Sequence, residues 1–206
     1  MAIMYRYPQV YNLVVRTLHG KYLRKRYEII GDEIGEHKNV FELGCGTAMV
    51  SSFLHSGCEY EGWDLNERFL AFCRERGLKV SNKDIFNFQS YPYSDVILIC
   101  DLLHHLVPRH ESLVLEALKR SKKLIISEPA RSFKPPARLK PIVSFLNYFL
   151  GDFDGFNNPA NQLEWDYNEE KLRNFFQKMG CTKTINVGWD MIAVFDKQEQ
   201  PVHKQL

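Results

Sequence analysis

Apolar and polar positions follow two alternating periods along the chain. Short apolar runs, typical of buried strands, are separated by segments in which apolar residues recur about every three or four positions, as in amphipathic helices. The runs that predict strands are residues 39–44, 59–65, 78–84, 95–101, 122–127, 181–187 and 189–195. Strands that alternate with helices in this order predict a parallel sheet built from right-handed βαβ crossovers.

The helical segments carry recognisable end signals. Residues 10–34 predict two helices broken near Gly20, and Asn66 and Asn168 stand where an N-cap residue is expected. Gly57 and Gly77 suit left-handed helix ends. The other predicted helices cover residues 48–55, 66–76, 108–119 and 168–179.

These elements predict a Rossmann-like α/β fold: a mostly parallel seven-stranded sheet, helices on both faces, and a C-terminal antiparallel hairpin joined at Gly188. Residues 1–206 are expected to form a single domain that begins with N-terminal helices over residues 1–35. Residues 129–165 hold five of the nine prolines and are too long for a plain connection, so they are expected to be a lid-like insertion.

Composition narrows the class of protein. The chain of 206 residues is 45% hydrophobic and 25% charged, with a formal net charge of +2, so it gives no strong nucleic-acid signal. Its five cysteines lack paired spacing, which predicts reduced thiols, a cytoplasmic location and no metal site. No apolar run approaches the roughly 20 residues of a transmembrane helix. The oligomeric state is not indicated.

The segment FELGCGTA, residues 41–48, carries the clearest chemistry. A strand that ends in Gly44-x-Gly46 forms a turn tight enough for a ligand to lie against bare backbone. A dinucleotide fingerprint needs a third glycine at position 49, where Met49 stands. Glu42 would repel a pyrophosphate but suits a cationic ligand, which argues against a dinucleotide-binding oxidoreductase and leaves it as a weaker alternative.

With the acids that follow the later strands, this segment resembles the motifs of the class I, or Rossmann-like, S-adenosylmethionine-dependent methyltransferases. The resemblance implies S-adenosylmethionine as cofactor, with the glycine turn against it and Glu42 on its amino group. Asp64 would accept from the two ribose hydroxyls, for which a carboxylate is suited. The other cofactor contacts that the resemblance implies are Asp84 and the amide of Ile85 at the adenine, and Asp101 at the methionine moiety.

The implied reaction is direct methyl transfer to a small-molecule or lipid-like, amphipathic acceptor. His104 and His105, in DVILICDLLHHL, are the candidate catalytic bases, although either can be a packed histidine at a helix start. A non-catalytic S-adenosylmethionine- or nucleotide-binding protein remains the alternative function. Aromatic residues outside the core pattern suit either core or the walls of a substrate pocket; they are Tyr5, Tyr7, Tyr11, Phe145, Tyr148, Phe149, Phe153 and Phe156. A group of cations most simply suits a solvated helix face; these are Lys21, Arg24, Lys25 and Arg26.

Overall fold

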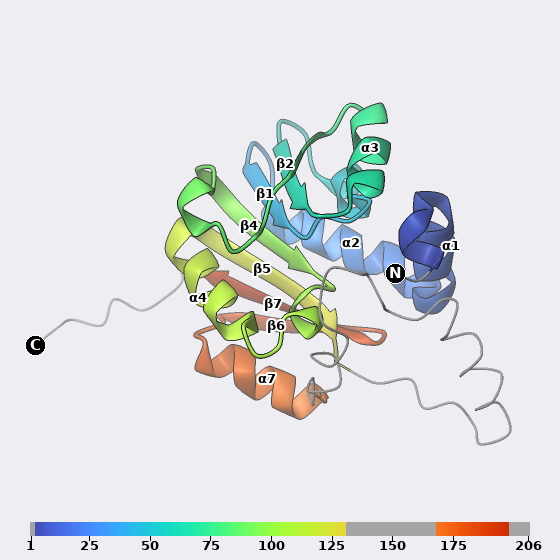
Figure 1. The fold of residues 1–206 in the computed structure, drawn as a ribbon. Helices are drawn as coiled ribbons and strands as arrows, with labels where there is room; N and C mark the ends of the chain where they lie inside the picture. Colours follow the sequence, from blue (N-terminus) through green and yellow to red (C-terminus); the bar gives the residue numbers. More distant parts are fainter. Residues whose placement is uncertain (1–2, 131–167, 198–206) are drawn as a thin grey trace, which may run out of the picture.

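A seven-stranded sheet organises the computed structural model, which describes residues 3–130 and 168–197 (Figure 1). Its strand order is β3-β2-β1-β4-β5-β7-β6. The strands are β1 (Asn39–Leu43), β2 (Glu59–Asp64), β3 (Lys79–Asn82), β4 (Ser94–Cys100), β5 (Ser121–Pro129), β6 (Lys183–Val187) and β7 (Asp190–Asp196). β1 to β5 pair in parallel, whereas β7 is antiparallel to both β5 and β6. The predicted mostly parallel sheet with a closing antiparallel hairpin is confirmed.

The helices begin and end close to their predicted signals. They are α1 (Pro8–His19), α2 (Lys21–Ile34), α3 (Glu67–Glu75), α4 (His110–Arg120) and α7 (Glu169–Lys178). Gly20 separates α1 from α2, as its position predicts. The side chains of Asn66 and Asn168 accept from the amides of Arg68 and Lys171, so both predicted N-caps are confirmed.

Helices cover both faces of the sheet, because alternate residues of each strand point to opposite sides. Phe41 and Leu43 of β1 join the cluster that α4 and α7 cover. Val40, directly before Phe41, joins the cluster that α2 covers. Figure 1 shows α4 and α7 on the near side of the sheet, with α2 behind it. The two layers fix the directions in which the strand-end side chains point.

One predicted helix is wrong and one predicted segment lies outside the described residues. Residues 48–55 form only the short 3-10 helix η2 (Met49–Phe53) instead of an α-helix. Ala48 before it is left-handed, with φ 51°, and the Ser51 hydroxyl donates to the Ala48 carbonyl, which competes with helical bonding. The predicted lid over residues 129–165 falls almost wholly in residues 131–167 and therefore outside the description.

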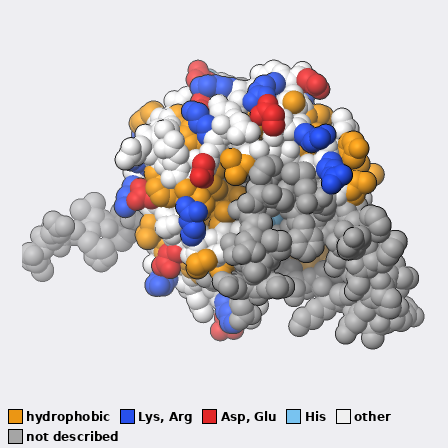
Figure 2. Space-filling model, viewed as in Figure 1, with side chains coloured by type: hydrophobic (Ala, Val, Ile, Leu, Met, Phe, Trp, Pro, Cys, Tyr) orange, Lys and Arg blue, Asp and Glu red, His pale blue; other side chains and the backbone are white. Residues whose placement is uncertain are grey.

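Neither sign of charge dominates the described part of the face drawn in Figure 2. On the face in Figure 2, basic and acidic side chains are interspersed among hydrophobic ones, and neither sign forms a continuous field over the coloured part. This distribution agrees with the small net charge of the chain. Within residues 3–130 and 168–197, no helix combines the length and the apolarity needed to cross a membrane.

Candidate functional site

A cavity of about 270 Å³ opens at the carboxyl ends of β1 to β4. In this strand order β1 lies between β2 and β4, where the chain connections change direction, and open α/β sheets bind ligands at such a switch point. The cavity wall contains every residue that the sequence predicted at a cofactor site: Glu42, Gly44, Gly46, Asp64, Asp84, Ile85 and Asp101. His105 also lines it, whereas His104 does not.

The turn after β1 needs glycine, because a side chain at Gly44 would collide with the neighbouring loop. Gly44 and Gly46 have φ of 65° and 53°, in the left-handed region that favours glycine. A Cβ atom on Gly44 would lie 2.7 Å from the Leu102 side chain. The turn therefore lies close against the loop after β4, and its bare backbone forms one wall of the cavity.

Asp64, at the end of β2, holds the glycine turn in place. Its Oδ2 accepts from the Gly46 amide at 2.8 Å, and its Oδ1 accepts from the Asn66 amide at 2.7 Å. Each carboxylate oxygen has a second lone pair, so Asp64 keeps the capacity to accept from ligand hydroxyls. Asp64 thus combines a structural role with a predicted ligand contact.

Glu42 is a buried acid in the cavity wall. Only 3% of the residue is exposed, and its carboxyl accepts a short hydrogen bond from the Tyr60 hydroxyl. Burial, opposed by the Tyr60 hydrogen bond and helped by the charge of Asp64, raises the pKa of Glu42 from 4.5 to about 8. Without a ligand, the Glu42 carboxyl therefore retains its proton at neutral pH. A cationic ligand group beside it would favour the charged form.

This shifted pKa predicts a stabilising substitution. The folded state holds the Glu42 proton up to about pH 8, but the unfolded chain loses it near 4.5, so wild-type stability falls as pH rises between these values. Glu42→Gln cannot titrate, and its stability relative to wild type should increase by up to about 1.4 kcal/mol per pH unit between pH 5 and 8. Urea unfolding at several pH values measures this difference. Glu36→Gln, at an exposed position, is the control, and parallel profiles for Glu42→Gln and wild type would contradict the prediction.

Asp84 and Ile85 lie at the rim after β3. Asp84 is exposed and its Oδ1 accepts from the Phe86 amide at 2.8 Å, while Ile85 is buried. The guanidinium of Arg109 lies 3.4 Å from the centre of the Phe86 ring and also lines the cavity. This part of the wall thus joins an acid to flat apolar and cationic surfaces, which suits a planar heterocycle.

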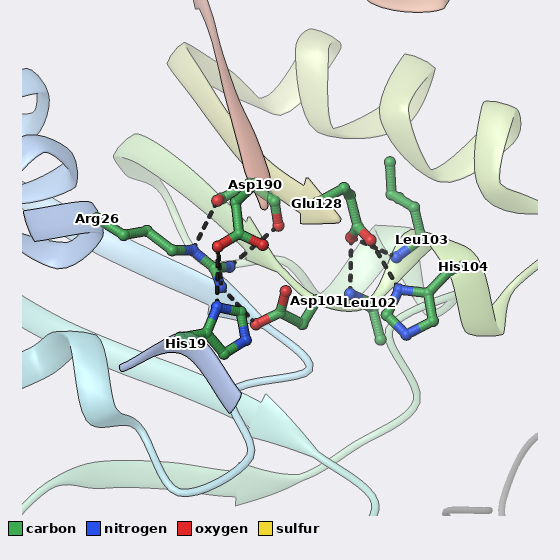
Figure 3. A network of polar contacts seen from close by, with 9 residues as sticks. His19, Arg26, Asp101, Leu102, Leu103, His104, Glu128 and Asp190 are labelled. Atoms are coloured by element: carbon green, nitrogen blue, oxygen red, sulfur yellow. Dashed lines mark hydrogen bonds and ion pairs between the residues drawn. The ribbon is translucent and has the colours of Figure 1, made fainter. Parts of the chain in front are cut away.

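The fully buried Arg26 and the half-buried Asp101 form an ion pair beside the cavity (Figure 3). Arg26, fully buried on α2, donates from Nη1 to Asp101 Oδ2 at 2.9 Å and from Nε to Ser127 Oγ at 2.8 Å. Asp190 lies 3.6 Å from the same Nη1, and it bonds to His19 at 2.9 Å. Burial would raise the pKa of Asp101, but the charge of Arg26 lowers it below its ordinary value. The interpretation of Arg26 as part of a solvated helix face is wrong.

Glu128 organises the loop that contains the two candidate histidines. It lies near the end of β5 and is fully buried. Its Oε1 accepts from the amides of Leu102 and Leu103, both at 2.7 Å, and its Oε2 lies 2.8 Å from His104 Nδ1. Figure 3 shows this group and the Arg26 group side by side, with Asp101 between them. Sequence reasoning missed Glu128, although an acid at the end of an apolar strand is the signal that identified Asp64.

The N-terminal segment closes the cavity. Tyr5, from the 3-10 helix η1 (Ile3–Arg6), and Tyr11, from α1, both line it, whereas Tyr7 is 51% exposed and does not. The Asn66 side chain donates to the Tyr5 carbonyl at 2.9 Å, which ties this segment to the start of α3. Of the predicted aromatic walls, Tyr5 and Tyr11 therefore lie at the cavity, and those in the insertion (Phe145, Tyr148, Phe149, Phe153 and Phe156) lie outside the described residues. Among the described residues, no three His, Cys, Asp or Glu side chains gather closely enough to hold a metal ion.

Comparison with protein families gives one match over more than half of the chain. The model described as methionine biosynthesis protein MetW matches residues 24–136, which include the glycine turn and all the cavity acids named above. Trans-aconitate 2-methyltransferase from Mycolicibacterium gilvum is 31% identical over 83 residues. That match covers 39% of this chain and 32% of the relative, so the chain spans about a third of the length of this curated relative.

Solved structures share the fold at low sequence identity. The selenomethionine-substituted CurJ carbon methyltransferase superposes with a TM-score of 0.59 and 17% identity, over 82% of this chain and 53% of the other. The 16S rRNA methyltransferase RmtF, in complex with S-adenosyl-L-homocysteine, superposes with a TM-score of 0.54 and 14% identity, over 87% of this chain and 62% of the other. These proteins act on different kinds of acceptor, so the shared fold alone does not identify an acceptor.

Proposed function

The chain belongs to the methionine biosynthesis protein MetW family and has the class I methyltransferase fold, and from this we propose that it is an S-adenosylmethionine-dependent methyltransferase. It would transfer a methyl group directly to a small-molecule or lipid-like acceptor. The bound cofactor would supply an electrophilic methyl group. The protein's own contribution is to hold the acceptor in line and to exclude water.

One observation carries the proposal: four acids, at the ends of four consecutive strands, line the same cavity as the glycine turn. Glu42 and Asp101 suit the ammonium group of the cofactor, because Glu42 is buried and Asp101 Oδ1 is a buried acceptor without a hydrogen-bond partner among the described atoms. Asp64 suits the ribose hydroxyls. Asp84 and the Ile85 amide suit the adenine, beside the Phe86 ring.

The same residues argue against the two alternatives. A dinucleotide would bring a pyrophosphate next to Glu42 and would find Met49, in a 3-10 helix, in place of the third glycine. A non-catalytic binding protein would need no oriented base, yet His104 bonds to a buried carboxylate. Conversion of S-adenosylmethionine to S-adenosylhomocysteine in the presence of an acceptor distinguishes an enzyme from a binding protein, and a titration with nicotinamide cofactors tests the oxidoreductase.

Calorimetry with S-adenosylmethionine and S-adenosylhomocysteine tests the proposal directly. Asp64→Ala removes the carboxylate expected on the ribose and should cost about 1.5–3 kcal/mol of binding free energy, a roughly 10- to 150-fold rise in Kd. Asp64→Asn keeps one acceptor oxygen and should lose less. Asp32→Ala is the control, because the Asp32 side chain is 71% exposed and away from the cavity wall. No detectable binding by the wild type would overturn the proposed function.

The acceptor would be sought in a panel that joins a metabolite extract to defined compounds. Trans-aconitate is a suitable first carboxylate, because it is named in the matched relatives. Phenols, alcohols and activated carbon acids represent acceptors whose attacking atom carries a proton. Lipid-like members of each class test the amphipathic preference, and release of S-adenosylhomocysteine reports turnover for all of them.

A further inference from the structure

The contacts of Glu128 assign the two nitrogen atoms of His104 to different roles. Glu128 is fully buried, so its carboxylate needs partners that donate to it. Two backbone amides donate to Oε1, at 2.7 Å each, so this oxygen acts as an acceptor in both contacts. An ionised carboxylate only accepts, so at 2.8 Å from Oε2 the Nδ1 atom of His104 carries the hydrogen. Nε2 is then the nitrogen with a lone pair.

We propose that Glu128 is a positioning residue that holds His104 in its Nδ1–H form, and that His104 Nε2 removes a proton from the methyl acceptor. This inference rests on the proposed methyltransferase function. As the proton passes to Nε2, the electron pair left on the acceptor atom forms the bond to the methyl carbon. The pair from the broken carbon–sulfur bond stays on sulfur, Glu128 stays ionised beside the imidazolium, and the proton then passes to water.

The surroundings distinguish His104 from His105. The ring centroids are 4.2 Å apart, but His105 is 6% exposed and lines the cavity, whereas 14% of the His104 side chain is exposed and His104 lies outside the cavity wall. A cavity of about 270 Å³ is at the small end of ligand pockets and suits one ligand, so the acceptor is expected beside it. Among the residues that the structure describes, the titratable groups facing His104 are Glu128 from β5 and Asp101 and His105 from its own loop, with His110 next along at the start of α4.

The pairing of Glu128 with His104 also limits the class of acceptor. A base is useful only when the attacking atom carries a proton at neutral pH, as in a phenol, an alcohol or a carbon acid. A carboxylate is already ionised and gains nothing from His104. The geometry therefore points to a hydroxyl or carbon-acid acceptor and away from methylation of a carboxylate oxygen.

Glu128→Gln tests this assignment with little change in shape. The amides of Leu102 and Leu103 both require an oxygen, so the Gln carboxamide must turn its NH₂ group toward His104 Nδ1. A donor at that position forces the hydrogen of the neutral imidazole onto Nε2, and the base is lost. Nitrogen-15 NMR of the full chain, with S-adenosylhomocysteine added, distinguishes the two tautomers; His104→Ala identifies the signal. Glu111→Gln, on the surface of α4 with 48% of its side chain exposed, is the matched control.

The expected result is an unprotonated Nε2 in wild type, a protonated Nε2 in Glu128→Gln, and a turnover loss on the order of 10²–10⁴ for hydroxyl acceptors only. A wild-type Nε2–H, or equal loss with carboxylate and hydroxyl acceptors, would overturn the inference. The wild-type spectrum decides even if Glu128→Gln fails to fold. Failure of the proposed function appears separately, as absence of S-adenosylhomocysteine binding.

Discussion

Replacing Arg26 by Met is expected to lower the free energy of unfolding by about 3–5 kcal/mol, because the change removes the cation beside the fully buried carboxylate of Asp190 and the half-buried carboxylate of Asp101. Arg26 is fully buried and pairs with Asp101 at 2.9 Å and Asp190 at 3.6 Å. Methionine keeps an apolar side chain in place of the Arg26 stem, so the loss of unfolding free energy measures the contribution of the charge and its hydrogen bonds. For a chain of this size the melting temperature should fall by roughly 6–20 °C.

Two further variants separate the ion pair from general effects of mutation. Arg24→Met, two residues away but with its side chain 80% exposed, should leave stability nearly unchanged. Asp101→Asn added to Arg26→Met removes one stranded charge and should recover part of the loss. Urea unfolding of the three variants measures these effects. Equal stability of Arg26→Met and Arg24→Met would contradict the structural role of Arg26.

Arg26 also illustrates what the sequence could not provide. The helix that contains Arg26 was predicted from local periodicity, but the partners of its side chain, Asp101 and Ser127, lie 75 and 101 positions away in the sequence. A run of four cations suggested a solvated face. The available signal was the stripe of Leu23, Arg26, Ile30 and Ile34, where the spacing of three and four places Arg26 among buried apolar residues. A cation on such a stripe indicates a buried partner without identifying it.

The residues that line the cavity were more predictable from the sequence than the residues that hold them in place. Gly44 and Asp64 could be found from the sequence, because a tight turn and the carboxyl ends of parallel strands impose local residue choices. Tyr60 and Glu128 were missed, since their roles depend on side chains that only the folded sheet brings together. The helix predicted over residues 48–55 failed for a local reason: the left-handed Ala48 and the Ser51 hydroxyl bond prevent a regular start.

His104→Ala is expected to reduce turnover by about 10²–10⁴-fold with a phenol, alcohol or carbon-acid acceptor, the range for loss of a general base. Binding of S-adenosylmethionine should hardly change, because His104 does not line the cavity that the cofactor is proposed to occupy. In wild type the rate should fall on the acid side, as imidazole protonates and Nε2 loses its lone pair. This acid limb should be absent from the residual activity of the variant.

The choice of acceptor is the internal control for this prediction. With a carboxylate acceptor no proton has to leave, so His104→Ala and wild type should react at similar rates. His55→Ala, at a surface position where 39% of the side chain is exposed, controls for the loss of a histidine elsewhere. Single-turnover rates across pH, with cofactor affinity measured alongside, separate chemistry from binding. If His104→Ala keeps the wild-type rate and acid limb with every hydroxyl acceptor, transfer depends on positioning alone and the base assignment is wrong.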